Sequence, residues 1–551
     1  MEEDNDGSSH ELHPLRLASL GSRSSDSFEK SPRQSEEDAT SPRVISDRNV
    51  ENDVLPETAA QGRNLGWYSA YIIIMSSVIG SGIFATPGTI VNSVGSIGLS
   101  LVLWVLGAIV SWAGLAVYLE YGCMLPRSGG DKVYLEFTYR RPRFFASTVF
   151  AVVAVLMGFT ASNCIIFGEY VDFALSTEAH PALRKWLSVG LLTAVTIMHG
   201  CFYKAGILVQ NTVGWMKVGS IALMVLASFF VVLFGSHQDS TTTSPSDKSS
   251  WSILWQGSNW NWGVVSMGFL EVLYTYGGLE TVNSVMNEVK DPVKTLKSAA
   301  PAALVSIAVL YILINVAIFS VVPIDEIKRD AELAGALFFE RTFGSTVGKV
   351  FLPLMVAFSA SGNVMVATFA LGRLNQEIAR QGFLPFGRIL ASNRPFNAPL
   401  AALIVHLIPS ILVITIPSGN VYKFILDVQG YPFQILTVAI SGGLILLRFK
   451  RPDLARPYRA WIPAVWFKIA LSFAFLVAPL VPRESKDGES WISQISYALV
   501  GIAIFAFAVL YWYVWTILLP RIKGYELEEI VEMLEDGTTI SKLVKVPKRV
   551  K

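Results

Sequence analysis

The chain alternates between long apolar runs and short polar segments over most of its length. A helix needs about 20 mostly apolar residues to cross the hydrocarbon core of a bilayer, and runs near that length recur from residue 68 to residue 519. The pattern predicts about twelve membrane-spanning helices, at 68–90, 97–122, 145–174, 186–203, 206–235, 262–287, 300–322, 346–376, 398–416, 420–447, 462–481 and 494–519. The expected fold class is therefore an all-α, multi-pass membrane protein.

Polar segments flank this region at both ends. Residues 1–62 are rich in Ser, Glu, Asp and Arg and have almost no apolar periodicity, which predicts a disordered N-terminal tail. Residues 63–520 form the predicted transmembrane domain, and residues 521–551 form a short C-terminal tail. Loops on the side of the N-terminus carry more Lys and Arg than the opposite loops, as at Arg140 and Arg141. This bias predicts that both tails are cytoplasmic.

Composition narrows the class of protein further. The chain is 52% hydrophobic and only 16% charged, with a mean hydropathy of +0.47, whereas soluble domains carry roughly 25% charged residues. A net charge of +1 gives no indication of a nucleic acid partner. Cys123, Cys164 and Cys201 lack the spacing of metal ligands, so we expect buried free thiols, no metal and no cofactor. The absence of a His-x-x-x-His pair, an Asp-Asp box and a Gly-x-Ser-x-Gly elbow argues against a membrane enzyme.

Two glycine-containing stretches interrupt the apolar runs. Gly80-Ser81-Gly82 lies in the run 68–90, and Tyr274-Thr275-Tyr276-Gly277-Gly278 lies in the run 262–287. The first stretch begins a Gly-x-Gly-x-x-Ala motif, which is typical of dinucleotide-binding turns. Such turns need an acidic residue about 20 positions later to bind the ribose, and no acidic residue follows until Glu120. Helix breaks at membrane depth are tolerated where the backbone lines a cavity. Breaks five helices apart are typical of a transporter with an inverted repeat, although close helix packing at small residues is the alternative.

The two breaks have complementary chemistry. The backbone N–H groups of Ser81, Gly82 and Ile83 would open a half-helix whose positive end faces a carboxylate. Released carbonyl groups would accept hydrogen bonds from an ammonium group, and they belong to Val78, Tyr274, Thr275 and Gly277. A site with both kinds of group fits a zwitterion, so the sequence predicts a free amino acid as the substrate.

The same residues resemble a known family. The runs "SSVIGSGIFATPG", "YTYGGLETVNSVMNEVKDP", "LYILINVAIFSVVP" and "LLRFKRPDLARPYR" are similar to the L-type amino acid transporter branch of the amino acid-polyamine-organocation superfamily, over about 65–520. The resemblance implies a five-plus-five inverted repeat with broken helices 1 and 6 and two peripheral C-terminal helices. It also implies an aromatic gate at Tyr274. More narrowly, "LEYGCMLPRSGGDKVYLEF" and "ARQGFLPFGRILASNRPFNAPL" resemble the fungal high-affinity methionine permeases, which alone implies methionine.

Charged and polar side chains inside the spans supply further candidates. A charge at membrane depth costs at least about 2.5–3.5 kcal/mol, and Lys217 lies well inside its span. The resemblance places Lys217 near the sodium position of sodium-coupled relatives, where it either takes part in proton coupling or acts as a fixed cation. Glu120 and Glu288 lie near the basic ends of their helices and are candidate gate ion pairs. Asn163, Asn283 and Ser361 are candidates for contact with the substrate side chain, and the resemblance assigns no role to Glu280.

The sequence thus predicts a plasma-membrane permease that imports L-methionine by proton symport, with cysteine and other neutral amino acids as further candidate substrates. An obligatory neutral amino acid exchanger and a sensor that binds without transport remain the alternatives. Exchanger light chains of the family carry a cysteine between helices 3 and 4, and residues 175–185 contain none, so no disulfide-linked heavy chain is expected. Serines of the N-terminal tail and the lysines Lys542, Lys545, Lys548 and Lys551 are candidate sites for ubiquitin and endocytic adaptors.

Overall fold

Helices account for most of the residues that the structure describes. The computed structural model describes residues 44–47, 54–59, 62–84, 86–175, 180–234, 254–329, 334–382, 386–416, 420–477, 480, 491–533 and 539–547. Most of the predicted N-terminal tail lies outside these residues. The helices are α1 (Trp67–Val78), α2 (Thr86–Val94), α3 (Ile97–Met124), α4 (Asp131–Thr138), α5 (Phe145–Met157), α6 (Ala161–Leu175), α7 (Pro181–Cys201), α8 (Tyr203–Phe234), α10 (Trp262–Thr275), α11 (Pro292–Val321), α12 (Ile324–Arg329), α13 (Ala334–Phe343), α14 (Ser345–Arg380), α15 (Gly387–Ala391), α16 (Leu400–Thr415), α17 (Asn420–Lys450), α18 (Ile462–Val477), α19 (Trp491–Tyr513) and α20 (Leu519–Lys523). Two 3₁₀ helices, η2 (Ser81–Phe84) and η3 (Thr281–Glu288), and a π-helical stretch, η6 (Val514–Leu518), complete the helical part.

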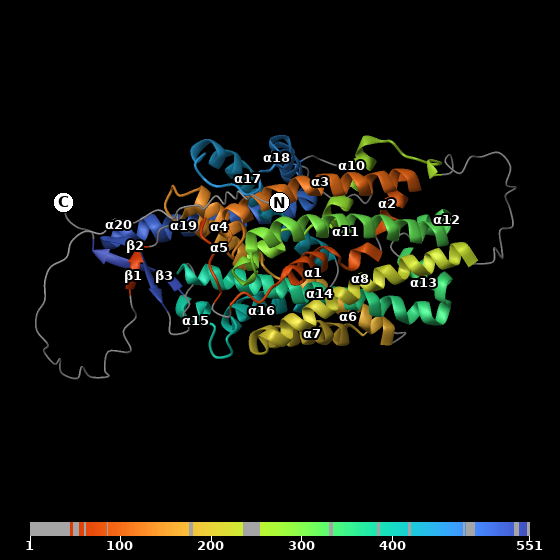
Figure 1. Ribbon diagram of the computed structural model, residues 1–551, viewed down its shortest axis with the longest axis horizontal. Coiled ribbons are helices and arrows are strands. Elements are labelled where there is room, and N and C mark those ends of the chain that lie inside the picture. Colours follow the sequence, from red (N-terminus) through yellow and green to blue (C-terminus); the bar gives the residue numbers. More distant parts are fainter. Residues whose placement is uncertain are drawn as a thin grey trace, which may run out of the picture. The chain divides into compact units, whose positions relative to one another are not determined.

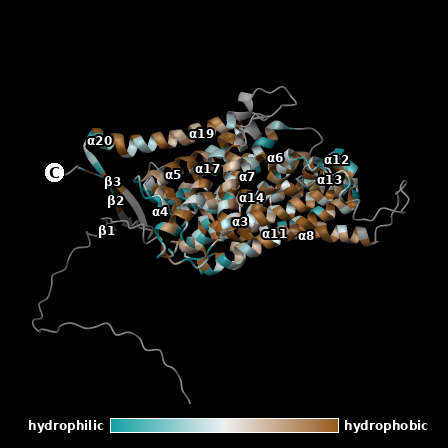
Figure 2. Cartoon of the chain, turned by 90° about the horizontal axis from the view of Figure 1, so that it is seen from above, coloured by the Kyte–Doolittle hydropathy of each residue, from teal (hydrophilic) through white to brown (hydrophobic). Residues whose placement is uncertain are grey.

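The helices have the length and composition of membrane spans. Seven helical segments of the described chain are long and apolar enough to cross a bilayer, and α1, α10, α16 and α18 are shorter apolar helices. Hydrophobic residues predominate along the helices and hydrophilic residues gather near their ends (Figure 2). These features confirm a multi-pass helical membrane protein. The count of twelve crossings and the inverted repeat stay predictions.

Helix α14 forms the centre of the packing. It contacts α6, α8, α13 and α16, while α11 packs against α1 and α3 (Figure 1). Helix α1 is buried on nearly every face, because it contacts α8, α11 and α14. Since lipid and apolar side chains attract one another about equally, close contact between helices rather than exclusion of water holds such a bundle together. The first broken helix therefore lies inside the protein, where an interrupted backbone finds partners.

A third interruption separates α5 from α6, where the sequence predicted one helix over 145–174. The chain leaves the helix at Gly158, and the exposed backbone groups are bound by side chains from distant elements. The Ser410 hydroxyl accepts from the Thr160 N–H at 3.2 Å, and the Gln429 amide donates to the carbonyls of Met157 (2.8 Å) and Phe159 (3.1 Å). The predicted span is confirmed as Phe145–Leu175, but it consists of two helices. The break was not predicted because the side chains that bind its backbone lie more than 200 residues away in the sequence.

Both ends of the chain contribute to a small antiparallel sheet. Strand β1 (Val44–Asp47) pairs with β2 (Tyr525–Met533), which pairs with β3 (Thr539–Pro547) in a hairpin. The purely helical fold class missed this sheet, and part of the segment expected to be a disordered N-terminal tail is strand β1. We call the end of the bundle that carries β1–β3 the tail side; α12 and α13 lie at the opposite end (Figure 1).

Candidate functional site

The two predicted helix breaks are present and touch each other. Helix α1 ends at Val78 and α10 ends at Thr275, each in the middle of its apolar run. The hydroxyls of Ser77 and Thr281 are hydrogen-bonded at 2.7 Å. Gly278 has a φ of +103°, and a Cβ at this position would lie 2.7 Å from the Ser77 Oγ. Only glycine fits there without strain, since both the backbone conformation and the close approach exclude a larger residue.

A cavity of about 840 Å³ opens at this contact. Its walls come from both breaks and from α2, α3, α6, α11, α14, α17, α18 and α19. Seven of the predicted substrate-binding residues line it, namely Val78, Gly82, Ile83, Asn163, Tyr274, Thr275 and Gly277. Ligand sites of this size are typical of small molecules, and the breaks supply backbone groups to it directly.

The first break differs in detail from the expected half-helix. Ser81, Gly82 and Ile83 belong to the 3₁₀ turn η2, and the α-helix itself begins at Thr86. The Thr86 hydroxyl donates to the Gly82 carbonyl at 2.8 Å, which ties the turn to the helix that follows. The first N–H groups of a 3₁₀ turn, like those of an α-helix, have no partner within the turn. The structure therefore differs from the prediction in where the α-helix starts, while backbone N–H groups are still available at the break.

The second break uses some of its carbonyl groups internally. The Gly277 N–H donates to the Tyr274 carbonyl at 3.1 Å, and the Thr275 hydroxyl donates to the Val272 carbonyl at 2.6 Å. The Tyr274 side chain is 77% exposed and lines the cavity. Its neighbour Tyr276 is buried and packs against Trp104 and Tyr311. Both tyrosines of the motif line the cavity, but the Tyr274 side chain is largely exposed and the Tyr276 side chain is buried.

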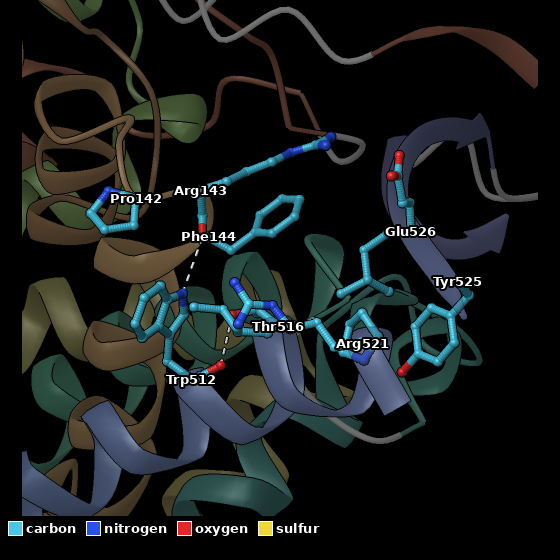
Figure 3. A pocket seen from close by; sticks show the side chains of 11 residues that line it. Pro142, Arg143, Phe144, Trp512, Thr516, Arg521, Tyr525 and Glu526 are labelled. Atoms are coloured by element: carbon cyan, nitrogen blue, oxygen red, sulfur yellow. Dashed lines mark hydrogen bonds between the residues drawn. The ribbon is translucent and has the colours of Figure 1, made fainter. Parts of the chain in front are cut away.

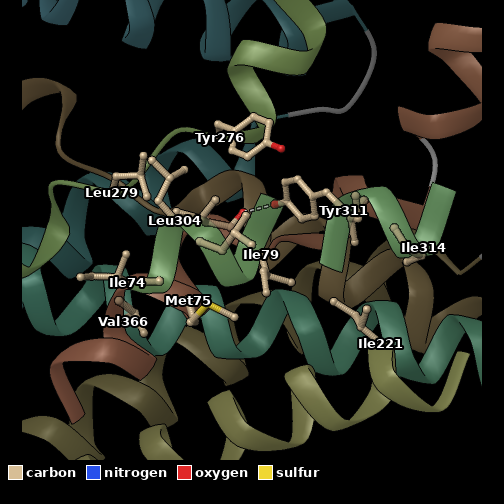
Figure 4. Close-up of a cluster of buried hydrophobic side chains, with 14 of the residues drawn as sticks. Ile74, Met75, Ile79, Ile221, Tyr276, Leu279, Leu304, Tyr311, Ile314 and Val366 are labelled. Carbon is tan, nitrogen blue, oxygen red and sulfur yellow. Dashed lines mark hydrogen bonds between the residues drawn. The ribbon is translucent and has the colours of Figure 1, made fainter. Parts of the chain in front are cut away.

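Tyr311 on α11 joins the two breaks and was not singled out from the sequence. Its hydroxyl lies 3.1 Å from the Val78 carbonyl and 3.1 Å from the Thr275 carbonyl. Figure 4 shows this ring beside Ile79 and Tyr276 in the buried core. A hydroxyl has a single proton, so it donates to one of these carbonyls at a time. The only signal in the sequence was a tyrosine within the quoted run "LYILINVAIFSVVP".

Lys217 on α8 binds the end of α1. Its ammonium group donates to the carbonyls of Ser76 (3.1 Å) and Ile79 (2.7 Å) and to the Asn363 Oδ1 (2.6 Å). The side chain is buried, with 3% of its surface exposed. A cation at the C-terminal end of a helix interacts favourably with the helix dipole. All acceptors of the three ammonium protons are neutral, and they include the Ser76 hydroxyl at 3.4 Å.

Asn283 and Ser361 do not line the cavity described here. Asn283 is buried, and a Cβ at Gly122 would lie 2.8 Å from its Oδ1, which places it between η3 and α3. The Ser361 hydroxyl donates to the Phe358 carbonyl of its own helix at 2.7 Å. Asn363, two residues further along α14, lines the cavity instead and contacts Lys217. The polar residue at this wall is thus half a turn from the predicted one.

The two gate candidates form buried ion pairs outside the cavity. Glu120 pairs with Arg448 and accepts from the Ala460 N–H at 2.8 Å, so it joins α3 to the connection between α17 and α18. Glu288 at the end of η3 pairs with Arg373 of α14 and accepts from the Tyr203 hydroxyl. Breaking a buried pair by removing one partner costs about 3–5 kcal/mol, so both pairs fasten helices on the tail side.

The segment before α1 adds a further cluster of ion pairs on the tail side. The Glu57 carboxylate contacts Arg127 at 3.2 Å, Arg380 at 2.5 Å and the Asn287 Nδ2 at 3.3 Å. The backbone of the same segment bonds to η3, since the Ala59 N–H donates to the Asn287 carbonyl at 3.0 Å. One carboxylate therefore joins η3 to the ends of α3 and α14.

A second cavity, of about 360 Å³, lies on the tail side. Its lining includes Arg143, Trp512, Arg521 and Tyr525 (Figure 3), and the Trp512 indole donates to the Arg143 carbonyl at 3.1 Å. It is formed where the last helix leads into strand β2 and contains no helix break. The central cavity is therefore the candidate site.

Comparison with known proteins shows that the chain is similar to amino acid permeases. A family model described as amino acid permease matches residues 65–511. The low-affinity and high-affinity methionine permeases of Saccharomyces cerevisiae are each 32% identical to the chain, covering 88% of it and 88% and 84% of their own lengths. The b(0,+)-type amino acid transporter 1 of Mus musculus is 26% identical, covering 87% of the chain and 94% of the relative. The matches extend over both helix breaks.

Proposed function

The chain belongs to the amino acid permease family, a family of membrane transporters and not of enzymes, and we propose that it imports L-methionine by proton symport with alternating access. The observation that carries the proposal is the contact of two broken helices at one cavity. There the turn at Ser81–Ile83 offers N–H groups to the substrate carboxylate, and the carbonyls of Val78, Thr275 and Gly277 accept from its ammonium group. Backbone groups thus bind the carboxylate and ammonium groups, which all free amino acids share.

The identity of the substrate depends on the side-chain part of the cavity. Besides the residues of the two breaks, Asn163, Phe433, Leu471 and Phe475 line the cavity. Apolar and aromatic side chains suit a thioether, which is polarisable and packs well against rings. Similarity to two methionine permeases supports methionine first, and cysteine or other neutral amino acids are further candidates for the same wall.

Alternating access requires a barrier on each side of the site. We assign the barrier opposite the tail side to the exposed ring of Tyr274, which closes over bound substrate and excludes water. On the tail side the barrier consists of the Glu288–Arg373 and Glu120–Arg448 pairs together with Glu57. Opening toward the tail side would separate these contacts in turn.

The cellular setting follows from the charge of the loops. The Lys and Arg bias supports a cytoplasmic tail side, and the import of an external amino acid supports the plasma membrane. In that orientation the lysines of the C-terminal segment, such as Lys545 on β3, are available to ubiquitin and endocytic adaptors. Lys217 either carries the coupling proton or acts as a fixed cation at the end of α1.

Uptake of radiolabelled methionine tests the proposal. Cells lacking their own methionine permeases would express the chain, and uptake would be measured at two external pH values with and without an uncoupler. Symport predicts concentrative uptake that increases in acid and collapses with the uncoupler. Uptake that ignores the proton gradient and requires internal amino acid would indicate an exchanger, while binding without uptake would indicate a sensor.

A further inference from the structure

The second cavity, on the tail side, has no part in the proposed transport cycle. It has a volume of about 360 Å³ and lies between the loop before α5 and the end of the last spanning helix. Arg143 of that loop and Arg521 of α20 both line it, although they are far apart in the sequence (Figure 3). The fold therefore brings two guanidinium groups to one small cavity.

The residues around these guanidinium groups do not neutralise them. Among the residues that the structure describes, Arg143 and Arg521 have no carboxylate within ion-pair distance, and this includes Glu526, which also lines the cavity. The Arg143 guanidinium lies 4.8 Å from the centre of the Phe144 ring. Such a contact uses the face of the guanidinium plane and leaves its N–H donors available. Two cations and one carboxylate line the cavity, so one positive charge is in excess.

The wall that carries Arg143 is held in place by packing. The Trp512 indole donates to the Arg143 carbonyl at 3.1 Å, and its ring packs edge-on against Phe145 with the ring centres 5.0 Å apart. The chain then enters the π-helical stretch η6, where the Thr516 hydroxyl donates to the Trp512 carbonyl at 2.7 Å. Single π-helical turns in α-helices are frequent at functional sites. The cavity thus has the fixed backbone of a preformed site.

The cavity lies where the last spanning segment ends. Residues Ser496–Lys523 are apolar and long enough to cross a bilayer, and only 6% of their most apolar window is buried inside the protein. Phe507 and Leu510 on α19 are more than half exposed, so this helix faces lipid. Tyr513 and Trp515 then precede the basic helix α20, and aromatic residues of this kind are typical of the membrane–water interface. Basic pockets at this depth suit the head groups of anionic lipids.

We propose that this cavity binds the phosphate group of an anionic phospholipid from the tail-side leaflet. Arg143 and Arg521 donate to the phosphate oxygens, for which the planar guanidinium group has a matching geometry. The acyl chains lie beside the exposed apolar face of α19. Apolar walls at Phe144, Ile517 and Pro520 favour a lipid over a free phosphate ion, since a small hydrated ion gains nothing from them.

Lipid binding to the full-length protein tests this site directly. Wild type, Arg143→Ala and Arg521→Ala would be purified in detergent and titrated with dioleoylphosphatidylserine or dioleoylphosphatidylcholine, with bound lipid measured by native mass spectrometry. We expect wild type to prefer the serine lipid by at least about fivefold, and each variant to lose about fivefold in affinity for it, as removal of one basic residue near an anionic head group gives. Glu526→Gln should bind the serine lipid more tightly than wild type, because it removes a repelling charge.

Two further variants separate the site from a general effect of charge. Arg459 is an exposed arginine in the connection between α17 and α18 and does not line the cavity, so Arg459→Ala should keep the wild-type affinity. Arg521→Lys keeps the charge without the planar fork and should lose less affinity than Arg521→Ala. Arg143 and Arg521 are both exposed, so the lipid-free variants should unfold at the wild-type temperature, which a thermal scan verifies.

Three results would overturn the inference. They are equal affinity of wild type for the two lipids, unchanged affinity for the serine lipid in both alanine variants at the cavity, and displacement of that lipid by an equal concentration of inorganic phosphate. The last result would assign the cavity to the free ion. Methionine is absent from these measurements, so their failure leaves the proposed transport untouched, and a failure of uptake leaves the lipid site untouched.

Discussion

The Tyr311 hydroxyl contacts the Val78 and Thr275 carbonyls, two of the three that the proposed function assigns to the substrate ammonium group. A carbonyl oxygen has two lone pairs, so the hydroxyl holds the carbonyls in position and leaves one acceptor site on each for the substrate. Tyr311→Phe removes a hydrogen bond with a net value of about 0.5–1.5 kcal/mol, and we expect the KM for methionine to rise about 2- to 10-fold. Tyr276→Phe is the matched control, because its hydroxyl donates to the Trp104 carbonyl, at 3.3 Å, and not to a substrate carbonyl. Tighter binding in Tyr311→Phe would mean that the hydroxyl competes with the substrate.

The buried charge of Lys217 can be tested by substitution as well. Its hydrogen-bond acceptors are neutral and lie at the end of α1 and on α14. Lys217→Met therefore leaves buried acceptors unpaired, at about 1–3 kcal/mol each. We expect lower thermal stability and slower uptake, with the pH dependence of the residual uptake unchanged. Lys217→Arg, which keeps the charge, should restore part of the stability. If Lys217→Met bound methionine normally but its uptake lost its pH dependence, Lys217 would be the coupling residue and not a fixed cation.

At the scale of elements, the contact of the two breaks requires glycine at 278. Alanine there would have to adopt a φ of +103° and approach the Ser77 Oγ to 2.7 Å. Backbone strain of about 1–3 kcal/mol adds to about 1–3 kcal/mol of overpacking. Gly278→Ala should therefore lower the midpoint of thermal unfolding and abolish most uptake. Gly219→Ala is a suitable control, because nothing lies within 4 Å of a Cβ at that position in α8. Uptake by Gly278→Ala at the wild-type rate would show that the breaks need not touch during transport.

The sequence predicted elements well where a single run of residues determines them. Gly80-Ser81-Gly82 and Tyr274–Gly278 marked both breaks, because glycines in an apolar run of spanning length already contradict an uninterrupted helix. The break at Gly158 was missed because Ser410 and Gln429, which make it tolerable, are remote in the sequence. The sequence also could not give the rotation of α14, which depends on its contacts with α6 and α8 and brings Asn363 to the cavity wall.

At the scale of the whole molecule, Glu57 stabilises the closed tail side by joining the segment before α1 to α3, α14 and η3. These pairs are only partly shielded from solvent, so we estimate their net contribution at about 1 kcal/mol, which corresponds to about a fivefold change in the population of open molecules.

Modification of Cys123 can measure this opening, because the Cys123 side chain on α3 is only 3% exposed in the closed structure. In a background with Cys164 and Cys201 replaced by alanine, Glu57→Gln should increase the rate of Cys123 modification by a membrane-permeant maleimide about fivefold, and saturating methionine should alter that rate in both proteins. Arg451→Ala removes an ion pair confined to one loop, with Asp453, and should leave the rate unchanged. An unchanged rate in Glu57→Gln as well would mean that the buried pairs Glu120–Arg448 and Glu288–Arg373 alone keep the tail side closed.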